Sequence, residues 1–165
     1  MGKLTIRKGK EEDIDQLLKI FDSARKFMRV NNNFSQWSDT YPGRDDILSD
    51  MAKGNNYVGT DEEGEIVMTF TFILGEDPTY KIIKDGEWLN EDYYGTIHRI
   101  ASNGKVSRVL QEACEYGFHL VKNIRIDTHE DNKPMQKALS RLGFIRCGII
   151  NCRDGSPRIA FQKSL

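Results

Sequence analysis

Cysteine is scarce in this sequence, neither sign of charge predominates, and no long apolar run occurs. The three cysteines among 165 residues, Cys114, Cys147 and Cys152, are too few and too scattered for a disulfide framework or a zinc cage. A reduced, cytoplasmic chain is the simplest interpretation of this usage. No apolar stretch approaches the roughly 20 residues needed to cross a bilayer, and the first residues lack the apolar core of a signal peptide. We therefore expect no membrane association.

The charge balance also limits the possible partners. Lys and Arg number 24 and Asp and Glu number 25, so the formal net charge is -1. That balance provides no electrostatic argument for nucleic acid or an anionic membrane as a partner. Hydrophobic residues make up 38% and charged residues 30%, which is typical of a globular protein. Because repeats and linkers are also missing, we expect a single domain spanning 1–165.

The apolar pattern predicts an α/β (α+β) fold with the element order β-α-α-β-β-β-α-β-α-β-β. Ile14, Leu17 and Phe21 recur at helical spacing, and this helix is expected to end near Asn31. A hairpin follows a second, short helix, and alternate residues of its second arm are expected to share one face: Ile66, Met68, Phe70, Phe72 and Leu74. The other expected strands are 4–7, 57–60, 96–102, 124–128, 144–152 and 158–162, and the other expected helices lie within 45–53, 106–117 and 132–142.

A strand that turns directly into a helix is the most informative local pattern. In HRIASNGKVSRVL, residues 98–110, the strand breaks at Asn103-Gly104-Lys105 and helical spacing follows at once. Arg at position 99 and Val at position 106 exclude a P-loop, and the G-x-G-x-x-G pattern is absent. What remains is a helix N-terminus with free backbone N–H groups, beside Lys105 and Arg108, which can hold a phosphate. A plain turn with two solvated cations is the alternative.

Two stretches resemble the GNAT acetyltransferase superfamily. They are HRIASNGKVSRVLQEACEYGF, from residue 98, and IRIDTHEDNKPMQKALSRLGF, from residue 124. The second is similar to the family helix N-x-x-A-x-x-L-Y-x-x-x-G-F, with Asn132, Gly143 and Phe144 in place. The order of elements matches across nearly the whole chain. The resemblance implies a GNAT-like fold, with a mixed, mainly antiparallel sheet flanked by helices, and an N-acetyltransferase that uses acetyl-CoA.

The resemblance also implies where acetyl-CoA binds. The fourth strand would pair with the pantetheine arm, and the helix N-terminus would hold the pyrophosphate. The family loop is Q/R-x-x-G-x-G/A, and here Lys105, Arg108 and Leu110 stand at its three defined positions. Because two glycines are replaced, Arg108 is expected to contact phosphate directly. The expected cofactor-binding residues are Ile100, Ala101, Ser102, Lys105, Val106, Ser107, Arg108, Val109, Leu110 and Asn132.

Catalysis is assigned to His98 on the fourth strand. Some superfamily members use a histidine here to deprotonate the amine, and an ordinary histidine pKa of about 6.5 suits a base near neutrality. A hydrogen-bonded core histidine is the alternative. Leu139 occupies the position of the usual tyrosine acid. The acceptor pocket is expected to include aromatics from the loop before residue 43 and from the long connection 75–93, together with one acid: Trp37, Tyr41, Tyr80, Trp88, Tyr93 and Asp127.

No metal is expected. The run DTHED, residues 127–131, lacks convincing ligand spacing and is interpreted as a strand end followed by a helix cap. The leading hypothesis is therefore direct transfer of an acetyl group from acetyl-CoA to an amine, by a monomer or homodimer that does not bind nucleic acid. The alternatives are a catalytically impaired acyl-CoA-binding module or sensor, and an interaction domain on the same scaffold.

Overall fold

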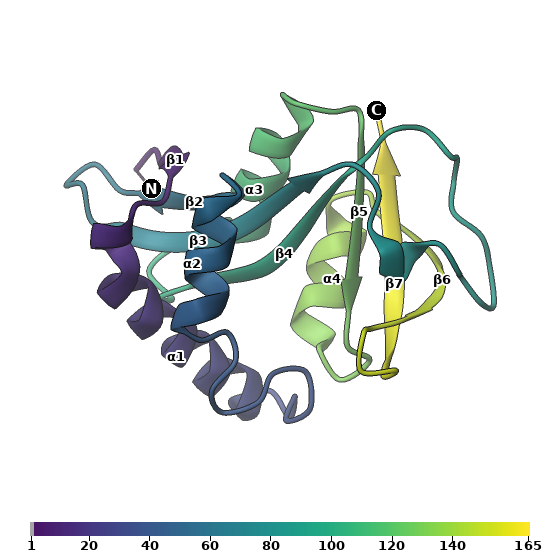
Figure 1. Ribbon diagram of the computed structural model, residues 1–165, viewed down its shortest axis with the longest axis horizontal. Helices are drawn as coiled ribbons and strands as arrows, with labels where there is room; N and C mark the ends of the chain where they lie inside the picture. Colours follow the sequence, from purple (N-terminus) through teal and green to yellow (C-terminus); the bar gives the residue numbers. More distant parts are fainter. Residues whose placement is uncertain (1) are drawn as a thin grey trace.

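The computed structural model describes residues 2–165, and its elements follow the order predicted from the sequence. The strands form one seven-stranded sheet in the order β1-β2-β3-β4-β5-β7-β6 (Figure 1). Every pairing is antiparallel except that of β4 with β5. The expected mixed, mainly antiparallel sheet is thus confirmed. The strands are β1 Thr5–Lys8, β2 Asn56–Thr60, β3 Ile66–Leu74, β4 Gly95–Ser102, β5 Asn123–Thr128, β6 Ile145–Asn151 and β7 Pro157–Ser164. The helices are α1 Ile14–Val30, α2 Arg44–Ala52, α3 Val109–Phe118 and α4 Lys133–Arg141, with 3-10 turns η1 Glu11–Asp13 and η2 Pro78–Tyr80.

Helices cover both faces of the sheet. The apolar stripe of α1 buries Leu17 and Phe21 against one face, in a cluster that also contains Ile47 of α2. The opposite face carries the larger cluster, which includes Leu110 of α3 and Leu139 of α4. Burial of these stripes, rather than helix propensity, supplies most of the stability of such short helices.

The sequence pattern placed Ile66 on the same face of the sheet as Met68, and this prediction was wrong. The pairing of β2 with β3 shifts register, so that Thr60 faces Ile66 and Gly59 faces Met68, which leaves Val67 as an extra residue. One extra residue inverts the alternation of side chains. Ile66 therefore packs with α1 and α2, whereas Met68 packs on the α3 side.

The most consequential feature of the sheet is a split between β4 and β5. These strands pair at two positions, Gly95 with Ile124 and Thr96 with Arg125, and then diverge (Figure 1). Just beyond, β4 contains a bulge, because His98 faces Thr71 and Ala101 faces Thr69. Two residues of β4 therefore oppose one residue of β3, and such bulges increase local twist. The bulge turns the rest of β4 away from β5.

The turn after β4 is longer than expected. The sequence predicted a helix directly after Gly104, but α3 begins at Val109. Gly104 adopts a φ of 85°, and the backbone N–H of Lys105 donates to the Asn103 side chain at 3.0 Å. This Asx-type turn takes the place of the first helical turn, because the Asn103 side chain satisfies a backbone donor locally.

The segment between β3 and β4, residues 75–94, covers the face of β5, β6 and β7 opposite α4. Tyr80, Trp88 and Tyr94 from this segment pack against Cys147 and Ala160. The backbone of the segment also forms a bridge between Lys84 and Ile149. Within residues 2–165, no helix combines the length and apolar character required to cross a membrane.

Candidate active site

His98 lies where β4 leaves β5, and it has a carboxylate partner. Its Nε2 atom is 3.1 Å from Oδ2 of Asp77, which belongs to the segment between β3 and β4. The other Asp77 oxygen accepts from the backbone N–H of Thr79 at 2.8 Å and from the Thr79 hydroxyl at 2.7 Å. With Asp77 on Nε2, the Nδ1 atom of His98 is the ring nitrogen left for a substrate. The arrangement is an imidazole held by an anchored carboxylate.

Asp77 remains a carboxylate over a wide pH range. Burial alone raises its pKa, but hydrogen bonds from His98 and Thr79 outweigh burial and lower the pKa from 3.8 to about 2. A carboxylate of this kind fixes the orientation and the tautomer of the imidazole.

Tyr80 and Asp127 form a second polar pair on the same face of the sheet. The Tyr80 hydroxyl donates to Oδ2 of Asp127 at 2.6 Å. Burial, followed by the charge of Asp127, raises the pKa of Tyr80 well above 10.0, so the phenol stays protonated. The Tyr80 ring lies 6.4 Å from the His98 ring, between centroids. Two of the predicted substrate residues therefore lie beside the predicted base.

The bulge next to His98 is held by a buried ion pair. Arg99 has a φ of 48°, which is uncommon for a residue with a side chain. Its guanidinium donates to both oxygens of Asp50 on α2, each at 2.7 Å, and to the Tyr41 hydroxyl at 3.1 Å. Asp50 also accepts from Thr71 at 2.7 Å. Because Asp50 is anchored on both sides, it fixes the bulged backbone at Arg99, within the open part of β4.

The loop between α1 and α2 approaches the open end of the split. Trp37 packs edge-on to Phe21 at 5.9 Å and to Tyr41 at 6.1 Å, between ring centroids. Gln36 accepts from the side chain of Asn132, the N-cap of α4, at 2.9 Å. The loop therefore joins the two halves of the sheet where β4 and β5 have separated.

The residues expected to bind acetyl-CoA differ in the groups that they can present to it. The side chain of Leu110 is buried in the larger core cluster, so Leu110 can meet a ligand through its backbone alone, whereas the half-buried side chains of Val106 and Val109 pack against that cluster. The N-cap residue of α3, Arg108, makes no side-chain cap, which leaves first-turn N–H groups for a ligand. The hydroxyl oxygen of Ser102 accepts a hydrogen bond from the backbone N–H of Gly104. Of the other expected residues, Ile100 is half-buried, Ala101 is buried and Ser107 is exposed.

The open edge of β4 fits an extended ligand. Beyond Thr96, the edge of β4 that faces β5 has no strand partner among residues 2–165. Backbone groups on such an edge can pair with an extended chain, as in strand addition. The residues present thus suit the pantetheine arm that the family resemblance implies.

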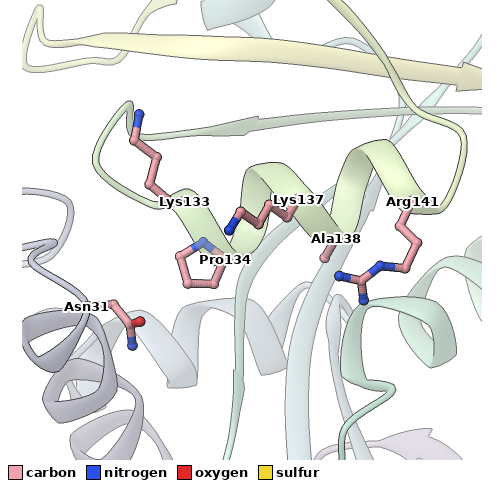
Figure 2. Close-up of a pocket in the computed structure, with 6 residues that line it drawn as sticks. All are labelled: Asn31, Lys133, Pro134, Lys137, Ala138 and Arg141. Carbon is pink, nitrogen blue, oxygen red and sulfur yellow. The ribbon is translucent and has the colours of Figure 1, made fainter.

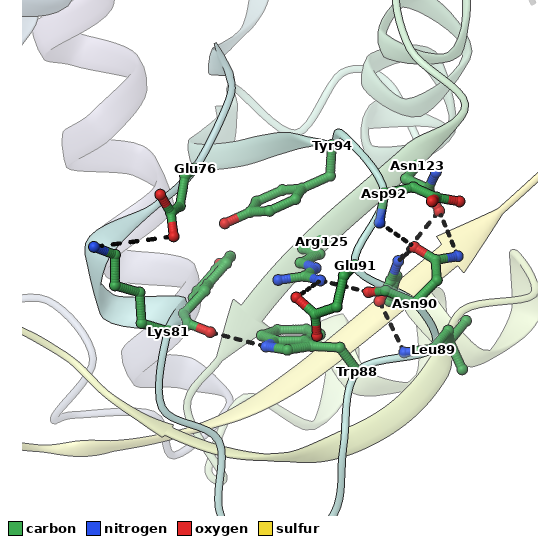
Figure 3. A network of polar contacts seen from close by, with 12 residues as sticks. Glu76, Lys81, Trp88, Leu89, Asn90, Glu91, Asp92, Tyr94, Asn123 and Arg125 are labelled. Carbon is green, nitrogen blue, oxygen red and sulfur yellow. Dashed lines mark hydrogen bonds and ion pairs between the residues drawn. The ribbon is translucent and has the colours of Figure 1, made fainter.

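Trp88 and Tyr93 lie apart from His98. Both line a cavity of about 520 Å³ beside Arg125 of β5. The Arg125 guanidinium lies 4.1 Å from the Trp88 ring centroid and 4.0 Å from that of Tyr94, and it donates to the carbonyl oxygen of Asn90 at 2.8 Å (Figure 3). Tyr80 separates this cavity from His98. The sequence grouped these aromatics in one pocket, whereas the structure distributes them over two places.

Comparison with solved structures identifies the fold. The chain is 33% identical to an acetyltransferase of the GNAT family from Streptococcus agalactiae 2603, with a TM-score of 0.86, over 98% of this chain and 95% of the other. This chain belongs to the GNAT acetyltransferase family. GNAT-family acetyltransferases from Listeria monocytogenes 4b F2365 and Bacillus cereus ATCC 10987 share the fold at 19% and 21% identity, with TM-scores of 0.71 and 0.61. They cover 98% and 99% of this chain, which in turn spans 95% and 98% of theirs. No family model and no curated protein sequence matches the chain.

Several residues of this candidate site were missed at the level of sequence. Asp77 was not among the expected site residues, although Asp-Pro-Thr is a recognisable start of a helical turn. Asp50 and Arg99 gave no local signal of their pairing. Leu139, at the usual tyrosine position, is fully buried in the core, so its side chain offers no proton donor.

Proposed function

We propose that this GNAT acetyltransferase transfers the acetyl group of acetyl-CoA directly to an amine, with His98 as the base. The observation that carries the proposal is the position of the His98–Asp77 pair, at the point where β4 and β5 separate. A base there would lie beside a thioester that entered along the open edge of β4. Residues 1–165 would act as one catalytic domain, as a monomer or a homodimer in the cytoplasm.

The donor would bind along β4 and at the start of α3. Backbone groups from Ile100 to Ser102 would pair with the pantetheine arm, and the uncapped N–H groups at the start of α3 would face the diphosphate. The helix dipole favours negative charge at that end. Backbone N–H groups are present whether or not these positions are glycine. The side chains of Arg108 and Leu110 nevertheless leave less room for phosphate oxygens to approach those N–H groups.

The chemical step would involve few protein groups. Acetyl-CoA supplies a thioester, whose carbonyl carbon bonds to the amine nitrogen as its bond to sulfur breaks. Nδ1 of His98 would take the proton that the amine nitrogen loses, while Asp77 holds the ring through Nε2. A backbone N–H on the open edge of β4 would polarise the carbonyl. The thiolate can leave without a tyrosine acid, because an ordinary thiol pKa is only about 8.5.

The acceptor would be an amine with a second positive charge nearby. Asp77 and Asp127 are both close enough to the Tyr80 hydroxyl to raise its pKa, so two carboxylates lie on the acceptor side. Two aromatic rings lie near the same face, because the Arg99 guanidinium donates to the Tyr41 hydroxyl and the Trp37 ring packs against Tyr41. Carboxylates and aromatic faces both favour cations.

The proposal is tested by combining binding with turnover. Acetyl-CoA is expected to raise the melting temperature, because it binds the folded state. Thiol release is then measured with a panel of monoamines, diamines and amino acids, and is expected to depend on amine and to favour diamines. A thermal shift without amine-dependent thiol release would instead identify an acyl-CoA-binding module. The absence of a shift at millimolar acetyl-CoA would refute the proposed donor.

A further inference from the structure

The loop that precedes α3 has little free positive charge to offer a phosphate. The ammonium of Lys105 lies 2.8 Å from the Glu65 carboxylate, and the guanidinium of Arg108 lies 3.2 Å from the Glu112 carboxylate. Each loop cation is therefore already paired within the protein. If this chain binds a highly anionic donor, most of the compensating charge must come from elsewhere.

A row of cations on α4 provides such charge. Lys133, Lys137 and Arg141 are spaced four residues apart, so successive members lie about 6 Å apart along the helix axis. All three are exposed and line one cavity of about 450 Å³, together with Asn31, Pro134 and Ala138 (Figure 2). No acidic residue lines this cavity, and none of the three cations has an ion-pair partner within residues 2–165. We call these three residues the α4 cation row.

The α4 cation row flanks the side of the split on which the donor would bind. The helix follows β5 directly, and its buried residue Leu139 joins the same core cluster as Leu110 of α3. Asn132 starts the helix at the open end of the split, where Gln36 reaches it. From there α4 runs back beside β5 (Figure 1), and the cavity lined by its exposed row is also lined by Asn31, at the end of α1 in the N-terminal half.

We propose that the α4 cation row supplies the main cationic contacts to the phosphate groups of the acyl donor, beside the backbone N–H groups at the start of α3, because both cations of the loop are already paired with carboxylates. This inference rests on the proposed function, since it assigns residues to the donor of that reaction. Coenzyme A carries a diphosphate and a 3′-phosphate, whose separated charges suit cations spaced by helical turns. Lysine and arginine bind phosphate through charge-assisted hydrogen bonds. The row therefore selects a nucleotide-bearing donor over a bare pantetheine thioester.

Titration calorimetry of the whole chain tests this assignment. The double variant Lys137→Gln/Arg141→Gln removes two charges from exposed helical positions, so it keeps the fold. The matched control Lys19→Gln/Lys122→Gln removes two exposed charges elsewhere. The probes are acetyl-CoA, 3′-dephospho-acetyl-CoA and acetyl-pantetheine, each at two salt concentrations.

The double variant is expected to raise the Kd of acetyl-CoA by roughly 10- to 100-fold and to reduce its dependence on salt. The Kd of acetyl-pantetheine should stay within about twofold, and the control should match the parent for every probe. If the parent binds acetyl-CoA and the double variant binds it equally well, the α4 cation row has no role and the proposed function stands. An equal loss of affinity for acetyl-pantetheine would also overturn the assignment. If the parent itself fails to bind acetyl-CoA, the proposed function and this inference fall together.

Discussion

The two halves of the sheet, on either side of the β4–β5 split, are built in different ways. In the N-terminal half, β3 pairs with β4 along most of its length, and helices cover both faces. In the C-terminal half, α4 covers one face, and the irregular segment 75–94 covers the other with aromatic side chains. The regular half holds β4 in place, and the irregular segment brings Asp77 and Tyr80 to His98.

The ion pairs follow the same division. In the N-terminal half, Asp50 and Arg99 join a helix to a strand, with side chains 9% and 20% exposed. Between the irregular segment and β4, Asp77 and His98 form a pair that stays partly open, with side chains 17% and 23% exposed. The comparison suggests a structural role for the first pair and a chemical role for the second.

The largest expected effect comes from breaking the structural pair. Asp50→Asn leaves the Arg99 guanidinium largely buried without a counter-charge, beside a bulge with positive φ. We expect the free energy of unfolding to fall by roughly 2 to 4 kcal/mol, as measured by urea denaturation. The control Glu65→Gln removes the partner of exposed Lys105 and should match the parent. Equal behaviour of the two variants would show that the Asp50 pair does not hold the bulge.

The chemical pair is tested first at His98. His98→Ala removes the proposed base, so kcat should fall by on the order of 100-fold while the Kd of acetyl-CoA changes little. Steady-state thiol release and calorimetry measure the two quantities. The control His119→Ala removes an exposed histidine at the end of α3 and should retain full activity. An unchanged kcat for His98→Ala would leave it a structural residue.

The pH dependence of stability distinguishes the Asp77 carboxylate from a neutral hydrogen-bond partner. Its folded pKa, about 2, lies below the ordinary 3.8, so ionised Asp77 stabilises the fold above pH 4 and loses that contribution as the pH falls toward 2. Asp77→Asn should therefore cost roughly 1 to 2 kcal/mol near neutral pH, after allowance for solvent screening. Urea denaturation across this pH range should show the difference between parent and variant disappearing in acid. A difference independent of pH would contradict the assignment.

The smallest expected effect concerns the loop that precedes α3. Because Glu112 already pairs with Arg108, Arg108→Ala should raise the Kd of acetyl-CoA by only about threefold, less than the double variant on α4. The companion variant Glu112→Gln frees the guanidinium and should tighten binding by a similar factor. Calorimetry under one salt condition compares the variants. A larger loss at Arg108 than on α4 would place the main phosphate contacts in the N-terminal half.

Local patterns predicted the elements well and their contacts less well. The element order and the end of α1 near Asn31 are confirmed, because each depends on residues within a few positions of one another. The start of α3 and the face of Ile66 were wrong, because an Asx-type turn and a bulge each interrupted a simple period. The sequence nominated His98, Tyr80 and Asp127, and the structure brings them together. The catalytic role of His98 and the substrate-binding roles of Tyr80 and Asp127 stay predictions.

The amino-acid sequence by itself determined the family resemblance, the order of strands and helices, and which strand carries the candidate base. The order of strands and helices follows from apolar periodicity and capping, which act over a few residues, and the family resemblance rests on two short stretches of the sequence. The tertiary structure decided the split and the partners of His98 and Arg99. Asp77 is 21 residues from His98 and Asp50 is 49 residues from Arg99, so each pair forms only when the sheet assembles. A local pattern contains no record of such contacts, because their geometry is created by the packing of elements that are distant in the chain.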